Sequence, residues 1–560
     1  MAVISTLLQS VDLVTAIGTL LALLASYVFY QTCIYPAYVS PLRHIPGPPN
    51  KSKHNKYHVP LMGLFLDFLY EDISEPYCRW TQKYGGIVCY PSIFNTRNVL
   101  ISDPKVIHHV FNTNGYQYPK LDRVIRLMST CTGLGLLFVE GDVHKRQRKM
   151  LNPAYHRRNI KEMVSTMEAP ANNLGRMWER LADESKNNSI ELDVARGLSN
   201  CTLDIIGLAG FGYDFQALTA PGNELVKAYR KLFRNGGMLN QILRNVFPCY
   251  SLVPSKNNRE RQHAVSTVEK VITQIVRDRR AEINAKQAGE ADAKDLMSIL
   301  IKANDMVDSQ DPDKLADSEL RAQIMSFMAA GHETTSVALT WMLHALSTHP
   351  EVQRKLRKEM LDHIGLPSNK APLSYDAINA LPYLNACVKE ILRVVPPVHT
   401  TSRVATQDDT ILGYDIPKGT LIYLSIRAVQ LNKDVFGEDA EEFKPERWLD
   451  PSTLTEHERG STKFVTSDMT WAYLPFLSGP RNCIGSKFAL IEMKVVLYHA
   501  LINLEFIPVP GFKFKKSKSV TCRAVPGMNL TIRRFNHDAV VGDTVVPTSY
   551  VPAVAAAVPC

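Results

Sequence analysis

Residues 476–485 read FLSGPRNCIG and place one cysteine between two glycines and close to an arginine. Gly479 and Pro480 favour a tight, rigid turn, and the helical pattern that follows places Cys483 just before a helix. Unpaired N–H groups and the positive end of the helix dipole stabilise a thiolate at such a position. Arg481 adds a cation beside the sulfur. We therefore predict that Cys483 is a nucleophile or an axial metal ligand.

The chemistry open to Cys483 depends on its possible partners. The chain has 10 cysteines without a CxxC pair or a repeating spacing, which does not indicate a disulfide scaffold. A cysteine nucleophile needs a histidine base that no motif supplies, and zinc needs three more ligands. Haem takes a single axial ligand of this kind from the protein. An inert cysteine is the remaining alternative.

The pattern F-x-x-G-x-R-x-C-x-G resembles the haem-binding signature of the cytochrome P-450 family of haem-thiolate monooxygenases. All five fixed positions match: Phe476, Gly479, Arg481, Cys483 and Gly485. The resemblance covers about residues 45–535. It implies a mainly α fold with minor β, a single large haem-thiolate domain, haem b (iron protoporphyrin IX) as cofactor and Cys483 as the iron ligand, with Phe476 shielding the sulfur.

Residues 330–335, AGHETT, resemble the oxygen-activation motif of the same family. Glu333 and Thr334 form an acid–alcohol pair in an otherwise apolar helix, and such a pair can deliver protons to bound dioxygen. We expect Gly331 to allow close backbone approach, with a local break or bulge in the helix. The alternative is a structural threonine beside a glutamate held in a salt bridge. His332 has no fixed role in the family pattern.

Glu390 and Arg393 match the E-x-x-R motif of the family, with both side chains on one helical face. The spacing alone is not specific, because residues 351–354 and 456–459 share it. The resemblance adds Arg447, from FKPERW, to the pair. We expect a buried three-member charge network that is structural and not catalytic.

Three further residues resemble family contacts to the haem propionates. Arg148 occupies the arginine position of a W-x-x-x-R helix, His144 stands where tryptophan is usual, and Arg403 matches another propionate arginine. A surface position is the alternative for Arg403. The neighbouring cations Lys145, Arg146 and Lys149 predict either a solvated basic face or a docking site for an acidic reductase.

The elements that must position these residues are mostly helical. The sequence predicts a long, buried helix over residues 319–348, capped by Asp317 and Ser318. Helical patterns also cover NELVKAYRKLFRNGG and AVSTVEKVITQIVRDRRAEINAKQ. Short strands are expected near GIVCYPSI, NVLIS, DTILGYDIPKGTLIYLS and MNLTIRR.

The N-terminal region predicts a membrane anchor. Residues 13–42 carry no charged side chain, and the apolar run is long enough to span a bilayer. A cleaved signal peptide is the alternative. Positive charges follow the run, which places the main domain in the cytosol. We predict an anchor over 1–35, a Pro-rich hinge over 36–55, a catalytic domain over 56–535 and a disordered tail over 536–560.

The resemblance and the composition also predict the partners. No flavin or nicotinamide fingerprint is found, so NADPH would be used indirectly, through an NADPH–cytochrome reductase, with a cytochrome b-type donor as an alternative. A single-pass monomer in the endoplasmic reticulum membrane is expected. The net charge of +9 suits an anionic membrane surface and is too diffuse to predict nucleic-acid binding.

The segments that resemble substrate-contact regions are largely apolar, which predicts a lipophilic small-molecule substrate. They are residues 116–137, Phe327 with Ala330, residues 395–401 and residues 525–528. The stretch LGLLFVEGDVHKRQRKMLNPAY resembles fungal members that act on terpenoids or other secondary metabolites. The alternatives are a reductase-independent isomerase or dehydratase of the same fold and a non-catalytic haem sensor.

Overall fold

The computed structural model describes the chain in two compact units, one formed by Met1–Tyr118 with Thr400–Ala428 and the other by Pro119–His399 with Val429–Cys560. The described residues are 13–52, 54, 61–72, 74–185, 187–220, 222–233, 250, 253–285, 294–308, 311, 313–367, 372–459, 462–517 and 519–537. The predicted tail therefore lies almost wholly outside the described residues.

The first unit contains a four-stranded sheet with strand order β1-β2-β7-β4. Its strands are β1 (Ile87–Pro91), β2 (Arg97–Ile101), β7 (Leu421–Ser425) and β4 (Thr400–Val404), and β5 (Asp409–Ile411) pairs with β6 (Tyr414–Ile416) in a separate hairpin. β2 and β7 run parallel, and the other neighbours run antiparallel. Buried β-branched and aromatic side chains, such as Val88 and Tyr90, form its core.

The helices of the first unit are short apart from the N-terminal one. They are α2 (Leu13–Phe29), η1 (Tyr30–Val39), η2 (Pro41–His44), α3 (Phe65–Tyr70), α4 (Glu75–Tyr84), η3 (Ile93–Asn95), α5 (Pro104–His108), η4 (His109–Thr113) and the start of α18 (Ile426–Gln430). The helical conformation of α2 continues into the π-helix η1, so it extends beyond residue 35.

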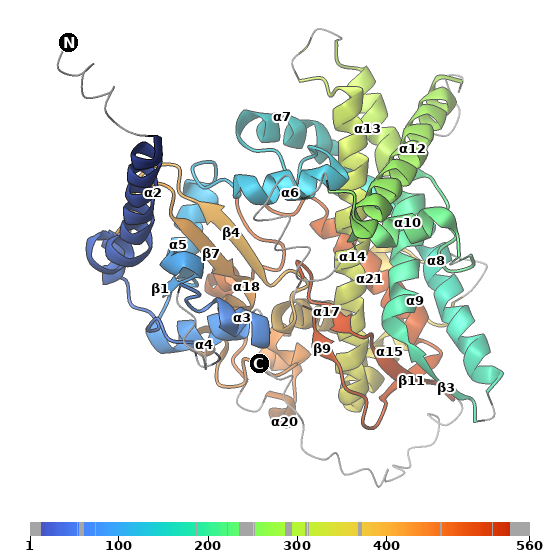
Figure 1. The fold of residues 1–560 in the computed structure, drawn as a ribbon. Helices are drawn as coiled ribbons and strands as arrows, with labels where there is room; N and C mark the ends of the chain where they lie inside the picture. Colours follow the sequence, from blue (N-terminus) through green and yellow to red (C-terminus); the bar gives the residue numbers. More distant parts are fainter. Residues whose placement is uncertain are drawn as a thin grey trace. The chain divides into compact units, whose positions relative to one another are not determined.

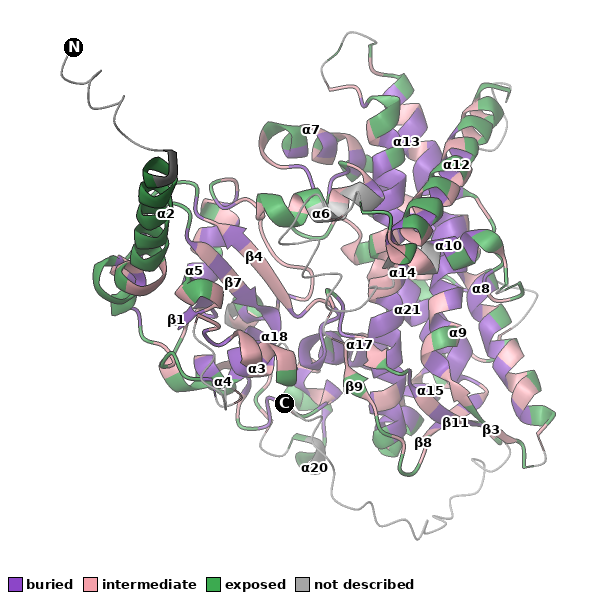
Figure 2. Ribbon diagram, viewed as in Figure 1, coloured by how far each residue is buried: buried purple, intermediate pink, exposed green. Residues whose placement is uncertain are grey.

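α2 is exposed along its described side chains (Figure 2). Its length and composition make Thr15–Val39 a candidate membrane span, and its exposure distinguishes it from the core helix of a soluble protein. The Pro-rich segment beyond it lies against β1, because the Cys89 N–H donates to the Pro46 carbonyl at 2.9 Å. A Cβ atom on Gly47 would lie 1.8 Å from the Cys89 carbonyl oxygen, so this close approach requires glycine.

The second unit is mainly helical (Figure 1). Its longer helices are α6 (Asp122–Thr132), α7 (Gly141–Leu151), α8 (Arg157–Asp183), α9 (Val194–Ile205), α10 (Glu224–Phe233), α12 (Lys256–Ala285), α13 (Leu296–Asp305), α14 (Asp317–Thr348), α15 (Pro350–His363), α17 (Pro382–Val394) and α21 (Ser486–Leu501). Its shorter helices are η5 (Asn152–Tyr155), η6 (Ile206–Gly210), α16 (Tyr375–Asn379), α19 (Lys433–Phe436), η8 (Pro445–Trp448), η9 (Pro451–Thr453), α20 (Glu456–Arg459) and η10 (Ser467–Ala472).

α14 runs through the core of the second unit and packs against α9, α17 and α21. The predicted helix is confirmed, but its N-cap is Ala316, whose N–H donates to the Glu319 carboxylate at 3.0 Å. Asp317 and Ser318 lie in the first turn, so the predicted caps are wrong by one and two positions. The helix is continuous through residues 330–335, and the expected break is absent from this described segment.

Two small sheets complete the second unit. β3 (Ser189–Asp193), β11 (Asn529–Arg534) and β8 (Leu504–Pro508) form one sheet, with β11 in the middle, and β9 (Lys515–Lys516) pairs with β10 (Ala524–Val525). The strands expected near GIVCYPSI, NVLIS, DTILGYDIPKGTLIYLS and MNLTIRR are confirmed across the two units. β3, β4, β8, β9 and β10 were not predicted.

Candidate active site

The loop before α21 holds Cys483 through its own backbone. The Cys483 N–H donates to the Phe476 carbonyl at 2.9 Å, and the Asn482 N–H donates to the Gly479 carbonyl at 3.1 Å. Gly479 has φ +76°, a conformation that favours glycine. Gly485 is the N-cap of α21, and its backbone N–H interacts with the Cys483 sulfur. The loop thus places the sulfur at a helix N-terminus, as the sequence indicates.

The protonation of Cys483 differs from the expectation. Burial raises the pKa of the Cys483 thiol, and the Gly485 N–H and the Arg148 cation lower it only in part. The cation that acts on the sulfur is thus Arg148, and not Arg481 as predicted. The loop alone therefore does not favour a thiolate, whereas a coordinated metal cation would make the thiol lose its proton.

The Cys483 sulfur is accessible although other parts of the protein lie close around it. Cys483 is exposed, yet enough protein surrounds it to raise the pKa of its thiol. Tyr155, which sequence reasoning missed, lies close enough for Cys483 to contribute to raising the pKa of its hydroxyl, and its ring packs edge-on against Phe327 of α14 at 5.5 Å. Further along α14, the mostly buried helix exposes Ala330.

A cluster of charges surrounds His144 on α7. Its side chain is buried, and burial followed by Lys120 lowers the pKa of His144 to about 4, with Arg481 and Arg148 acting in the same direction and Glu140 opposing them. The Glu140 carboxylate accepts from Arg481 and lies 3.3 Å from the Lys120 amine. Lys120 and Glu140 were missed, because they match none of the motifs that sequence reasoning used.

Arg148 holds the residue next to the cysteine. Its Nη1 donates to the Asn482 carbonyl at 2.6 Å, and its Nη2 donates to Asn482 Oδ1 at 2.8 Å. Together with Lys120 and Arg481 it gives three cations against the single carboxylate of Glu140. A cluster in which cations predominate suits a group that carries carboxylates.

The structure does not bring Glu333 and Thr334 together. The Glu333 carboxylate accepts from the Thr521 hydroxyl and lies 3.3 Å from Arg523 Nε. The Thr334 hydroxyl donates to the Ala330 carbonyl at 2.7 Å. This arrangement is the structural alternative considered from the sequence.

Gly331 is explained by packing between helices. A Cβ atom there would lie 3.1 Å from Ile206 Cδ1 in η6, a distance that requires the neighbour to shift. The glycine therefore permits close contact between α14 and η6, and the structure gives it no other function.

The Glu390 carboxylate lies at the centre of a network in which Glu390, Arg393 and Arg447 are fully buried. Arg393 donates to it twice at 2.8 Å, Arg447 Nε donates at 3.4 Å, and Trp448 Nε1 donates at 2.8 Å. The Lys444 backbone N–H adds a fifth bond at 3.0 Å. Burial alone would raise the pKa of Glu390, but Arg393 and Arg447 hold it below its usual range.

Arg403 lies in the first unit and is buried. Its Nη1 donates to Thr401 Oγ1 at 2.9 Å and to the Ser402 carbonyl at 2.8 Å, and its guanidinium stacks over the Phe111 ring at 4.6 Å. The alternative that Arg403 is a surface residue is therefore wrong, while its role toward a propionate stays a prediction.

Three basic residues of α7 are paired with carboxylates. Lys145 pairs with Asp142 at 2.8 Å, Arg146 with Glu319, and Lys149 with Asp313 at 2.6 Å. Their predicted part in docking a reductase stays a prediction.

Glu492 on α21 is a buried acid that the sequence analysis did not single out. Burial raises its pKa well above the usual range, and interaction with Thr335 lowers it only in part. The Thr335 hydroxyl also donates to the Gly331 carbonyl at 3.0 Å. The sequence signal that could have identified Glu492 is a glutamate within the otherwise apolar helical segment FALIEMKVV.

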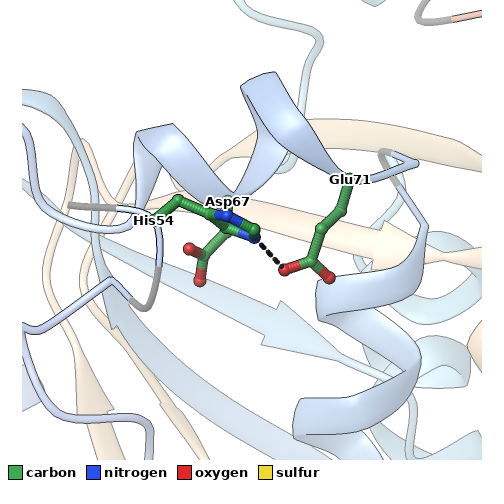
Figure 3. Close-up of side chains that lie close together, drawn as sticks. All are labelled: His54, Asp67 and Glu71. Atoms are coloured by element: carbon green, nitrogen blue, oxygen red, sulfur yellow. Dashed lines mark hydrogen bonds and ion pairs between the residues drawn. The ribbon is translucent and has the colours of Figure 1, made fainter. Parts of the chain in front are cut away.

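In the first unit, His54, Asp67 and Glu71 lie close enough together to hold a metal ion (Figure 3). However, Glu71 already pairs with His54 Nε2 at 3.0 Å and with Arg79 Nη1 at 2.8 Å, and Asp67 accepts from Ser52. The cluster is therefore a hydrogen-bond network that connects α3 with α4.

The second unit fits a haem-thiolate centre, because an accessible cysteine sulfur lies at a helix N-terminus beside a cluster that contains Lys120, Arg148 and Arg481. Comparisons with known proteins agree. The family model described as Cytochrome P450 matches residues 54–528. The chain is 34% identical over 512 residues to Cytochrome P450 monooxygenase 205 of Postia placenta, covering 86% of this chain and 90% of that protein.

Other fungal relatives show the same relationship. Cytochrome P450 monooxygenase sphH of Aspergillus fumigatus is 32% identical, with 84% of each chain covered. Cytochrome P450 monooxygenase claP of Ampulloclitocybe clavipes is 30% identical, with 79% of this chain and 83% of that protein covered. The chain belongs to the cytochrome P450 family, is an oxidoreductase of the monooxygenase class, and takes the haem that the family implies.

Proposed function

We propose that the protein oxidises or hydroxylates a lipophilic small molecule with O2 and with electrons that NADPH supplies through a separate reductase. The observation that carries this proposal is Cys483, an accessible sulfur that a rigid loop holds at the N-terminus of α21. Haem b, when bound, supplies the activation of dioxygen, and a cysteine ligand favours O–O cleavage.

The contacts of the site residues support the following roles. Cys483 binds the iron, Gly479 shapes the loop, and the Gly485 N–H supports the ligand sulfur. Phe476 is half-buried and packs against the core, where it keeps water from the sulfur. Glu390, with Arg393 and Arg447, holds the surrounding fold and takes no part in the chemistry.

The cations near the loop bind the propionates. Arg148 and Arg481 lie in this cluster, and His144 is neutral near pH 7, because burial lowers its pKa to about 4. A neutral imidazole can still donate one hydrogen bond to a carboxylate. Arg403 supplies a further cation. Glu333 and Thr334 move protons toward bound dioxygen, as their motif suggests.

The apolar helix over Thr15–Val39 anchors the enzyme in the endoplasmic reticulum membrane as a single-pass monomer with a cytosolic catalytic domain. The domains are an anchor over 1–35, a linker over 36–55 and a catalytic domain over 56–535. The electron donor is an NADPH–cytochrome reductase on the same membrane, with a cytochrome b-type protein as a second donor.

The substrate class follows from the apolar character of the segments that resemble contact regions, such as Phe327 on α14, which is buried. The resemblance to fungal members favours a substrate from terpenoid or other secondary metabolism, and the relatives named above are fungal as well.

The test is the carbon monoxide difference spectrum of the reduced full-length protein in carbonate-washed membranes. Wild type should show a thiolate-type Soret band in the membrane fraction, and Cys483→Ala should lose it. Cys387→Ala is the matched control, because Cys387 is buried in α17, and it should keep the band. A folded, haem-supplied wild type without the band would overturn the proposal.

A further inference from the structure

The acid of the AGHETT motif is held by residues to which no role has been assigned. The Thr521 hydroxyl donates to the Glu333 carboxylate, and Arg523 Nε lies 3.3 Å from the same oxygen, Oε1. Both partners come from the tip of the β9–β10 hairpin, far from Glu333 in the sequence. The Glu333 side chain is 16% exposed and that of Arg523 is 38% exposed, so the pair lies at the edge of the core.

Cys522, the residue between Thr521 and Arg523, is held by hydrogen bonds through both its N–H and its carbonyl. The Cys522 N–H donates to the Pro397 carbonyl at 2.8 Å, and its carbonyl accepts from Trp341 Nε1 at 2.6 Å. Trp341 lies on α14, two turns after Glu333. The position of Thr521 and Arg523 is thus determined by α14 and by Pro397, which lies in a segment that resembles a substrate-contact region.

This arrangement keeps the Glu333 carboxylate in contact with Thr521 and Arg523 and away from Thr334. Its carboxylate faces Thr521 and Arg523, while the Thr334 hydroxyl is satisfied by the Ala330 carbonyl. Consecutive residues on an α-helix point about 100° apart, so Glu333 can serve Thr334 only after its carboxylate leaves Arg523. An ion pair between partly exposed side chains shifts a population by about fivefold at most, so this contact can open in thermal motion.

We propose that Thr521 and Arg523 form a latch that positions Glu333 away from Thr334 and so limits proton delivery to bound dioxygen. The proposal rests on the monooxygenase function above and adds two positioning residues to it. When the latch opens, the freed Glu333 carboxylate takes up a proton from solvent and passes it toward Thr334, directly or through water, which leaves Glu333 as a carboxylate again.

The consequence can be measured without knowing the substrate. With no substrate present, one NADPH, one H⁺ and one O2 give NADP⁺ and H2O2, with both electrons passing through the reductase. Because this reaction consumes protons at the dioxygen site, opening the latch should accelerate it. The measurement is NADPH consumption by the haem-loaded full-length protein with a microsomal reductase, normalised to the carbon monoxide band.

The experiment is a double-mutant cycle. Arg523→Gln should raise substrate-free NADPH consumption about three- to fivefold, and Arg523→Lys, which keeps the cation, should remain within about twofold of wild type. In a Glu333→Gln background, Arg523→Gln should have no further effect. An equal effect of Arg523→Gln in both backgrounds, or no effect in either, overturns the latch.

Arg533→Gln is the matched control. Arg533 pairs with Glu505 at 2.6 Å in the same unit and is 52% exposed, and this change should leave the rate unaltered. If Arg523→Gln fails to incorporate haem, Thr521→Val removes only the hydroxyl and should still raise the rate about two- to fivefold through Glu333.

Hydrogen exchange gives a readout independent of turnover. In the haem-loaded protein, Glu333→Gln should accelerate exchange in peptides covering residues 519–525 about threefold or more. Unchanged exchange there would show that no latch exists. Failure of the proposed function is distinguishable, because it removes the thiolate band from every protein, whereas failure of the latch leaves the bands intact.

Discussion

Gly479 and Gly485 are both fixed positions of the motif around the cysteine, but their backbone conformations differ. Gly479 has φ +76°, whereas Gly485 has φ −84°, and a Cβ atom on it would lie 3.8 Å from Tyr155 in ordinary contact. We predict that Gly479→Ala costs about 1–2 kcal/mol and loosens the loop. Gly485→Ala should cost less than about 1 kcal/mol.

These variants are compared by thermal unfolding and by the fraction of protein that shows the thiolate-type Soret band. Gly479→Ala should reduce both more than Gly485→Ala does. Equal losses in the two variants would mean that the left-handed conformation of Gly479 does not limit the loop.

The two arginines near the cysteine have different partners. The motif places Arg481 two residues before the sulfur, but its guanidinium binds Glu140. Arg148, from α7, acts on the sulfur and binds Asn482. Sequence spacing gives a cation near the loop, whereas side-chain direction decides which cation it is.

At the scale of elements, α17 shows that burial distinguishes the E-x-x-R pair of Glu390 and Arg393 from other pairs with the same spacing. Glu390 and Arg393 lie fully buried where α17 meets η8. We predict that Glu390→Gln lowers stability by roughly 3–5 kcal/mol, because Arg393 and Arg447 lose the charge that compensates their burial. The measurement is the thermal midpoint together with the yield of haem-loaded protein.

Glu351→Gln is the control for this prediction. It has the same spacing to an arginine, at position 354, but both residues are exposed. It should change stability by less than about 0.5 kcal/mol. Similar losses in both variants would contradict the view that burial, and not spacing, makes the motif structural.

For the whole molecule, two buried histidines, His144 and His499, and the half-buried His344 link stability to pH. Burial is the main cause that lowers the pKa values of His144, His344 and His499 to about 4. The unfolded chain therefore binds more protons than the folded one between about pH 4 and pH 6.5. Stability is full above about pH 6.5 and is lost as the pH falls toward 4.

The loss between pH 7 and pH 5 should be roughly 1–2 kcal/mol for each of these histidines. His344 is the best one to test, because it packs against the rings of Trp341 and Phe514 and phenylalanine suits such surroundings. His344→Phe should show a smaller drop in thermal midpoint from pH 7 to pH 5 than wild type. An identical drop would contradict the assignment.

The sequence by itself determined the haem loop, the family and the long helix α14. These rest on local chemistry: glycine conformation, a helix start, and apolar runs whose period does not depend on distant residues. The short strands β9 and β10 escaped prediction, because two-residue strands carry no periodic signal. The caps of α14 were misplaced, since Glu319 reaches back to Ala316.

Only the tertiary structure decided which partners the charged residues take. Glu333 is adjacent to Thr334 in the chain, yet it binds Thr521 and Arg523, nearly two hundred positions away. Lys120 and Glu140 join the charge cluster without any motif. A long side chain can reach several partners, and which one it meets depends on how separate helices pack, which local sequence does not specify.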